Sequence, residues 1–282
     1  MQYPWRLPAP CKLNLFLHIT GRRADGYHLL QTIFQMLDVG DELQFTPTQD
    51  GQISLACSDP SLANSQNLVY RAASLLKQQA SADAGVRIYL DKRTPMGGGL
   101  GGGSSDAATT LHALNRLWQL NLSTAELAEI GLKLGADVPV FVHGKTAFAQ
   151  GVGEDLQPID LPEKIFLVVT PDVHVSTAEV FTHPDLIRNS PVLSPTSVLN
   201  SAWRNDCQPL VERLYPQVAI TLQWLLQYAP SRMTGTGASL FAEFQDELSA
   251  RRALADLPTN CRGFVARGVN QSPLLTELQH AV

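Results

Sequence analysis

The stretch Pro95-Met-Gly-Gly-Gly-Leu-Gly-Gly-Gly-Ser-Ser-Asp106 places six glycines in the seven positions from Gly97 to Gly103. Apolar residues recur at helical spacing directly after it, which predicts a helix that begins near Ser104–Asp106. Glycine lets the backbone adopt positive φ and approach a ligand closely, and the free N–H groups of a first helical turn attract anions. The stretch therefore predicts a phosphate-binding loop, although it lacks the Gly-Lys-Ser/Thr of a Walker A sequence. A flexible glycine linker is the structural alternative.

The composition is that of an ordinary globular protein. The chain has 282 residues, 44% of them hydrophobic and 17% charged, which is enough for one large or two medium domains. A net charge of −5 gives no electrostatic basis for binding nucleic acid or an anionic membrane, so we expect neither partner. We find neither a signal-peptide pattern at the N-terminus nor an apolar run of bilayer length, and we expect a cytoplasmic protein.

The cysteines and histidines predict neither a disulfide framework nor a zinc site. The four cysteines are widely spaced and include no Cys-x-x-Cys pair, which is typical of reduced thiols. The seven histidines form no spacing typical of metal ligands.

The first half of the chain alternates strand and helix patterns. A capping box at Ser123–Glu126 begins one helix, which we expect to stop at Gly135. Another helix is predicted over Asn67–Gln79, and a third follows the glycine loop. The predicted strands are Leu13–Ile19, Asp41–Thr46, Gln52–Ala56, Val86–Leu90, Val138–Val142 and Thr146–Ala149.

The second half alternates strands and helices in a way that suits a split βαβ sandwich. Its predicted strands are Ile165–Thr170, Leu240–Phe244 and Gly263–Gly268, and its predicted helices are Pro209–Gln227 and Glu247–Leu257. The prolines of His183–Pro195 indicate an irregular excursion. We place a domain boundary near Pro158–Pro162, which gives domains at 1–160 and 161–282.

Three further segments carry residues with possible chemistry. Ala9–Asn14 contains Lys12 beside a strand, Gly135–Pro139 contains Asp137 after a helix stop, and Ser231–Leu240 contains a second glycine turn. Each has an ordinary structural interpretation: an exposed lysine, a turn aspartate and a tight helix–strand connection. Taken together and in this order, they favour a functional interpretation.

The ordered set resembles the GHMP small-molecule kinases. Pro10–Leu15, Pro95–Ser105 and Thr234–Ala238 match the first, second and third motifs of that family. The resemblance implies an α+β fold of two domains. The N-terminal one would bind ATP and be similar to ribosomal protein S5 domain 2, and the C-terminal one would be a ferredoxin-like split βαβ domain. The active-site cleft would lie between the two halves.

One string points to a particular group within the family. Gly21-Arg-Arg-Ala-Asp-Gly-Tyr-His28 resembles the members that phosphorylate the 2-hydroxyl of a cytidine diphosphate conjugate of methylerythritol, in non-mevalonate isoprenoid biosynthesis. The strings Leu134–Phe141 and Tyr228–Ala238 resemble the same members. The similarity covers nearly the whole chain.

The resemblance implies that Asp137 is the general base, with Lys12 beside it. An aliphatic alcohol is a poor nucleophile at neutral pH, so a carboxylate that takes its proton assists the reaction. An adjacent ammonium would stabilise the developing negative charge on oxygen.

The resemblance also implies an ATP site built mainly from backbone. The loop and the first turn of its helix would hold the phosphates, supported by the third motif, and Asn67, Leu68 and Lys92 would surround the adenine. We expect Mg²⁺ to be held largely by phosphates and water rather than by protein carboxylates. The loop and third-motif residues are Pro95, Met96, Gly97, Gly98, Gly99, Leu100, Gly101, Gly102, Gly103, Ser104, Ser105, Gly235, Thr236 and Gly237.

The acceptor site is implied by a second set of residues. Tyr27 and Phe181 would stack on the cytosine, and His28 would hydrogen-bond its polar edge. Asn14 and Thr177 would hydrogen-bond the substrate. Position 182 is threonine here, whereas some relatives have lysine.

Three alternatives remain open at this point. A GHMP kinase for another alcohol, or a relative that also decarboxylates, is disfavoured by the Tyr27-His28 element. A catalytically inactive nucleotide-binding protein is disfavoured because both Lys12 and Asp137 are present. A structural domain with a glycine linker leaves the family order of the motifs unexplained.

Overall fold

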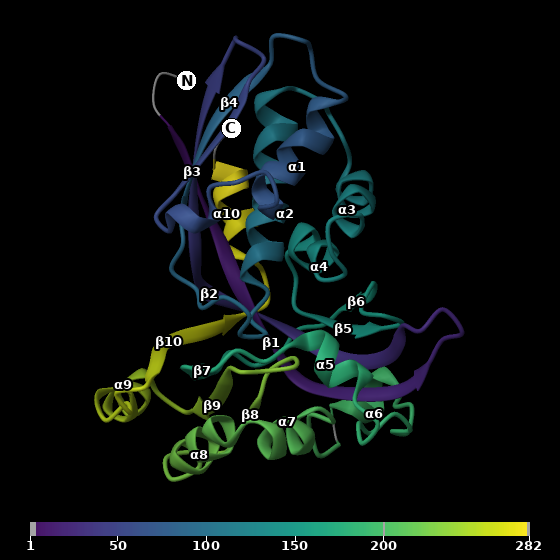
Figure 1. The fold of residues 1–282 in the computed structure, drawn as a ribbon, viewed down its shortest axis with the longest axis vertical. Helices are drawn as coiled ribbons and strands as arrows, with labels where there is room; N and C mark the ends of the chain where they lie inside the picture. Colours follow the sequence, from purple (N-terminus) through teal and green to yellow (C-terminus); the bar gives the residue numbers. More distant parts are fainter. Residues whose placement is uncertain (1–3, 200, 281–282) are drawn as a thin grey trace.

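The structure is a computed structural model that describes residues 4–199 and 201–280. Its first part, the upper half of Figure 1, is organised by a long antiparallel hairpin of β1 (Trp5–Arg22) and β2 (His28–Thr48). β4 (Gly85–Asp91) lies antiparallel to β2, and β3 (Ile53–Cys57) lies parallel to β4. β5 (Ala147–Gln150) pairs with β2 and with β6 (Asp155–Pro158). The hairpin extends beyond this part, so its lower end runs along the second part of the molecule.

Helices cover one face of this sheet and form the first hydrophobic core. They are α1 (Leu68–Lys77), α2 (Gly102–Leu117), α3 (Thr124–Leu132), α4 (Val138–His143) and α10 (Pro273–His280), with a short 3₁₀ turn η1 (Pro60–Leu62) before α1. The helix α10, which ends the described chain, packs against β1, and α2 packs against β1 and β2 (Figure 1). Leu274 and Leu278 of α10 are buried in the same core as Phe45 and Leu111.

The second part contains a four-stranded antiparallel sheet together with several helices. Its strands are β7 (Ile165–Pro171), β8 (Ser231–Met233), β9 (Leu240–Phe244) and β10 (Cys261–Val269), in the spatial order β10-β7-β9-β8. That is the order of a ferredoxin-like split βαβ unit. Its helices are α5 (Thr177–Thr182), α6 (Pro195–Val198), α7 (Gln208–Leu214), α8 (Pro216–Leu225) and α9 (Glu247–Ala255).

Two features join the parts. β10 pairs with β2 through Gly268↔Leu37 and Val269↔Met36, so both sheets form one continuous ten-stranded sheet. Leu17 and Ile19, near the end of β1, are buried in the core of the second part. The α+β fold expected from the resemblance is confirmed. The division at 160/161 stays a prediction.

Most predicted elements are present, and two predictions are wrong. Val138–Val142 is helix α4, not a strand, because a short apolar run suits either element and Pro139 is well placed in a first helical turn. The helix predicted over 209–227 is broken into α7 and α8 at Tyr215, which has φ −128° and ψ 85°. Pro216 causes the break, since proline disfavours helical backbone at the residue before it.

Some boundaries also differ. α3 ends at Leu132 rather than at Gly135, while its capping box at Ser123 and Glu126 is confirmed. β8 and α10 were not predicted, because β8 has only three residues and α10 follows the last segment that we assigned. Within the described ranges, no helix is both long and apolar enough to cross a membrane.

Candidate active site

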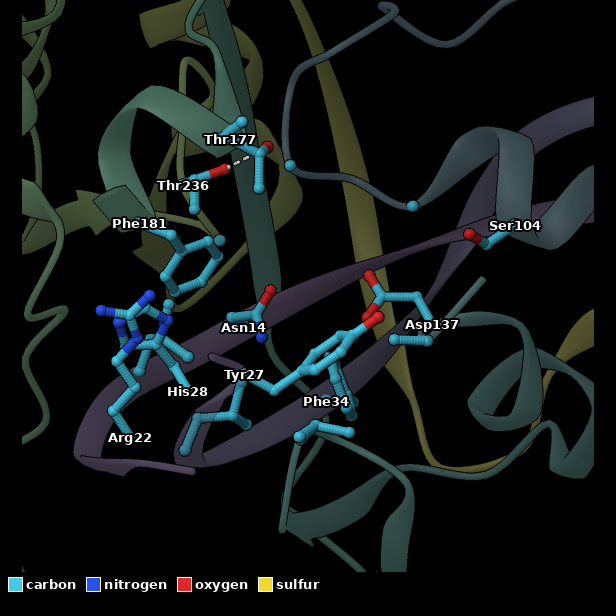
Figure 2. Close-up of a pocket in the computed structure, with 18 of the residues that line it drawn as sticks. Asn14, Arg22, Tyr27, His28, Phe34, Ser104, Asp137, Thr177, Phe181 and Thr236 are labelled. Carbon is cyan, nitrogen blue, oxygen red and sulfur yellow. Dashed lines mark hydrogen bonds between the residues drawn. The ribbon is translucent and has the colours of Figure 1, made fainter. Parts of the chain in front are cut away.

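A pocket of about 760 Å³ opens where the two parts of the chain meet. The β1–β2 hairpin forms its floor, the glycine loop and the start of α4 form one end, and α5 with the β8–β9 turn forms another side (Figure 2). The predicted residues Lys12, Asn14, Tyr27, His28, Ser104, Asp137, Thr177 and Phe181 all line it, together with Gly99, Gly101, Gly235 and Thr236. Residues from five segments that are distant in the sequence are therefore brought to one cavity.

At Gly99 and Gly101 the glycine loop passes too close to its neighbours to carry side chains. Gly99 has φ +73°, and a Cβ there would lie 2.5 Å from the carbonyl oxygen of Thr234 in the third motif. Gly101 has φ +72°, and a Cβ there would lie 2.7 Å from the ring of Phe141. Gly101 is also the N-cap of α2 and offers no side-chain cap, which leaves first-turn N–H groups available to an anion.

Lys12 and Asp137 form an ion pair at the same end of the pocket. The Nζ atom of Lys12 lies 3.5 Å from Oδ2 of Asp137, and the exposed fractions of the two side chains are 3% and 38%. The ammonium also donates to Oδ1 of Asn14 at 2.5 Å and to the carbonyl of Gly99 at 2.9 Å. Lys12 is thus fixed by hydrogen bonds to Asn14 and to the glycine loop. The carboxylate of Asp137, at the N-cap of α4, faces the pocket.

Asn14 links this pair to the third motif. Its backbone N–H donates to Oγ1 of Thr234 at 2.8 Å, and its Nδ2 donates to Oγ1 of Thr32 at 2.9 Å. On the other side of the pocket, the hydroxyls of Thr177 and Thr236 are 2.9 Å apart. These contacts connect the β1 strand, α5 and the β8–β9 turn around one cavity.

The opposite end of the pocket is aromatic. His28 and Phe181 are stacked, with ring centroids 5.0 Å apart and planes at 25°. Tyr27, in the turn before β2, has 63% of its surface exposed. In Figure 2 its ring extends towards Asp137 and Phe34, away from Phe181. Burial, and secondarily the charges of Arg188 and Arg22, lower the pKa of His28.

The residues predicted around adenine lie outside this pocket. Asn67 caps α1 by accepting from the N–H of Val69 at 2.9 Å, and Leu68 begins that helix. The ammonium of Lys92 is buried between the carboxylates of Asp41 and Asp106. Asn67 and Leu68 retain surface near the loop, whereas the charge of Lys92 is neutralised beneath the start of α2.

The carboxylate cluster under α2 was not foreseen from the sequence. Asp106 is buried with its Oδ1 atom unpartnered, and burial raises its pKa to about 8, with Lys92 acting in the opposite direction. The neighbouring Ser105 Oγ is also buried without a partner. Lys92 donates at 3.0 Å to both Asp106 Oδ2 and Thr94 Oγ1, so the cluster anchors the first turn of the helix.

Arg22 and Phe34 also line the pocket but were missed. Arg22 stands within the Gly21–His28 string, so its position was a usable signal. Phe34 lies in β2 at the register position opposite Asn14, and its ring lies 5.3 Å from the Nζ atom of Lys12. Only the pairing of the strands, which the sequence alone did not reveal, brings it there.

Two family profiles match the chain. The profile of the GHMP kinases N terminal domain matches residues 67–145, and that of the GHMP kinases C terminal domain matches residues 197–263. The two matched segments contribute the glycine loop with Asp137 and the third motif, respectively.

Curated relatives are similar over nearly the whole length. The 4-diphosphocytidyl-2-C-methyl-D-erythritol kinase of Shewanella putrefaciens is 60% identical over 97% of this chain and 96% of its own. The kinase of the same name from Shewanella woodyi is 59% identical over 95% of this chain and 94% of its own.

Solved structures agree with this similarity. A crystal structure of 4-(cytidine 5'-diphospho)-2C-methyl-D-erythritol kinase has a TM-score of 0.83 and 34% identity, covering 94% of this chain and all of that one. The mevalonate kinase of Methanococcus jannaschii has a TM-score of 0.70 at 17% identity, covering 95% of this chain and 99% of that one. The second likeness is one of fold alone.

Proposed function

The chain belongs to the 4-diphosphocytidyl-2-C-methyl-D-erythritol kinases of the GHMP kinase family, and on that premise we propose its reaction and the role of each site residue. The reaction is transfer of the γ-phosphoryl group of ATP to the 2-hydroxyl of 4-diphosphocytidyl-2-C-methyl-D-erythritol, which gives the 2-phosphate and ADP. The observation that carries the proposal is the pair of Lys12 and Asp137, 3.5 Å apart, between a glycine loop and an aromatic end of one pocket.

Asp137 is the general base in this proposal. Its carboxylate is accessible from the pocket, so it can accept the proton of the acceptor hydroxyl as the oxygen attacks phosphorus. Lys12 is fixed by Asn14 and Gly99, which holds its positive charge next to the oxygen that becomes negative. Phosphoryl transfer depends mainly on such positioning and charge stabilisation.

The ATP phosphates lie along 95–105 in this proposal, with 235–237 supporting them from the second part. Backbone N–H groups of the first turn of α2 and the hydroxyls of Ser104 and Ser105 are the donors. Of these two hydroxyls, that of Ser104 lines the pocket, whereas that of Ser105 is buried without a protein partner. Asn67 and Leu68 flank the adenine, and Lys92 acts from behind the loop through Asp106.

Mg²⁺ fits this site as an ion held mostly by phosphates. The described residues include no group of three His, Cys, Asp or Glu side chains that could form a metal cage. Mg²⁺ in kinases commonly takes one or two protein oxygens besides phosphate and water, and the hydroxyl of Ser104 can supply one. When bound, the ion neutralises charge on the transferring phosphoryl group.

The acceptor lies along the hairpin floor. Its cytosine lies among Tyr27, His28 and Phe181, and its methylerythritol part reaches Asp137, with Asn14 and Thr177 as hydrogen-bonding residues. The product would serve isoprenoid precursor biosynthesis. The four free thiols support a cytoplasmic location.

The test is an ADP-release assay with Mg-ATP and a panel of alcohols. The assay compares 4-diphosphocytidyl-2-C-methyl-D-erythritol with mevalonate and homoserine. We expect turnover of the cytidine conjugate alone. Turnover of another alcohol would overturn the acceptor assignment, and ATP binding without turnover of any acceptor would overturn the enzymatic assignment.

A further inference from the structure

Arg188 connects the irregular 183–194 segment to the aromatic end of the pocket. Its Nε donates to Nε2 of His28 at 3.0 Å. Its Nη2 donates to the carbonyls of Phe181 and His183 at 2.9 and 2.7 Å, and its Nη1 donates to the carbonyl of Leu186 at 3.1 Å. One guanidinium therefore holds both the ring of His28 and the backbone of its stacking partner.

The contact with His28 dictates where the imidazole proton sits. A guanidinium has only donors and stays charged, so the Nε2 atom that it contacts must be the unprotonated acceptor. The proton of the neutral ring is then on Nδ1. None of the described residues makes a hydrogen bond to this Nδ1 atom, and the side chain lines the pocket.

We propose that Arg188 is a positioning residue that fixes the Nδ1–H tautomer of His28, so that the pocket presents an N–H donor to the acceptor edge of a pyrimidine. This inference rests on the proposed function, which brings a cytosine to this end of the pocket. Cytosine offers the acceptors O2 and N3 on that edge. The other tautomer would direct a lone pair at those acceptors, and binding would be weakened.

The tautomer itself can be measured directly. In protein with ¹⁵N-labelled histidine, a long-range ¹H–¹⁵N spectrum separates protonated from unprotonated ring nitrogens. The signals of His28 are assigned by their loss in His28→Gln. We expect Nδ1–H in the unmodified protein and a shift towards Nε2–H in Arg188→Met. The same tautomer in both proteins, or Nε2–H in the unmodified one, would overturn the proposal.

Kinetics distinguish this role from simple bracing of the Phe181 backbone. We expect Arg188→Met to raise KM for the cytidine conjugate about tenfold, with kcat and KM for ATP within about twofold. In a His28→Ala background the same change should have no further effect on acceptor KM, because the ring through which Arg188 acts is gone. A tenfold effect that persists in that background would assign Arg188 to backbone bracing and refute the proposal.

The matched control is Arg213→Met. The exposed Arg213 forms an ion pair with Asp185, which lies in the 183–194 segment. Loss of Arg213 therefore disturbs this segment without removing a contact to His28. We expect unchanged acceptor KM, and a rise equal to that of Arg188→Met would contradict the role of His28. If the unmodified enzyme fails to turn over the conjugate, the proposed function is refuted. The tautomer measurement still tests the proposed role of Arg188 independently of turnover.

Discussion

At the scale of single residues, Lys12 holds the reacting end of the pocket together. Its ammonium donates hydrogen bonds to Asn14 and to the carbonyl of Gly99, and it forms an ion pair with Asp137. The glycine loop, the β1 strand and the N-cap of α4 are thereby fixed to one buried charge. A change at this position removes positive charge from the reaction and also releases the loop.

Lys12→Met should lower kcat by roughly 10²–10³-fold, because the developing charge loses its fixed cation. Steady-state ADP release measures the effect, and a thermal melt confirms that the variant is folded. The exposed Lys133→Met is the control and should keep full activity. A kcat for Lys12→Met within about threefold of the unmodified enzyme would contradict the role.

Residue types were easier to predict than their surroundings. Lys12 and Asp137 were identified through their motifs, although they are far apart in the chain, and the structure brings them into contact. The sequence contained no pattern that could predict the surroundings of Lys92. Its partners Asp41 and Asp106 are 51 and 14 residues away and stand in no recognisable spacing. Only strand pairing and the start of α2 bring those three charges together.

At the scale of elements, the glycine loop and α2 show that neighbouring glycines have different roles. Gly101 has a left-handed conformation and lies against Phe141, and a Cβ there would also lie 3.2 Å from Cε of Lys12. Gly103 is in the helix, and a Cβ there would meet only Leu68 Cδ1, at 3.7 Å. The first glycine is required by space and backbone conformation, whereas the second is not.

Gly101→Ala should reduce the free energy of unfolding by about 1–3 kcal/mol, because alanine is strained at that φ and collides with the ring. Gly103→Ala should increase it by about 0.5–1 kcal/mol, because alanine favours the helix. Urea unfolding of the two variants measures both effects. Equal stability of the two variants would show that the loop conformation does not select glycine at 101.

The elements predicted best are those with a clear period or cap. β9 was predicted with its observed bounds, and α3 begins at its predicted capping box. The prediction of a strand at 138–142 is wrong, because a run of five apolar residues has no periodicity that distinguishes a strand from a helix. The prediction of one helix over 209–227 is wrong, because the apolar spacing continues past Pro216 although the proline itself breaks the helix.

At the scale of the whole molecule, the two parts share their cores. β1 contributes Leu17 and Ile19 to the second core, and α10 returns Leu274 and Leu278 to the first. β2 and β10 are also paired. Each part of the molecule is therefore completed by a segment from the opposite end of the chain. We therefore expect one cooperative unfolding transition, in which a local change in either core alters the stability of the whole.

The free energy of unfolding should fall as the pH drops below about 6.5, which is the ordinary pKa of histidine. Burial lowers the pKa of His112 in α2 and of His18 in β1. At these two histidines the unfolded chain therefore binds more protons than the folded chain below that pH, which favours unfolding, whereas the raised pKa of Asp106 acts in the opposite direction. Free energies of unfolding at about pH 7.5 and about pH 5.5 measure the loss.

His112→Gln isolates one part of this effect. Glutamine can still donate to the carbonyl of Val142, which the His112 ring contacts at 2.9 Å, but it does not titrate. We expect a smaller loss of stability between the two pH values in this variant. An equal loss would show that His112 does not contribute to the acid sensitivity.

The central claim is that Asp137, beside Lys12, activates the acceptor hydroxyl for phosphoryl transfer. The most direct measurement is the single-turnover rate of Asp137→Asn with ATP and the cytidine conjugate, together with its affinity for ATP. Asparagine keeps the shape of the side chain but cannot accept the proton. We predict a rate lowered by roughly 10²–10⁴-fold with unchanged ATP affinity, whereas a rate within about threefold of the unmodified enzyme would contradict the account.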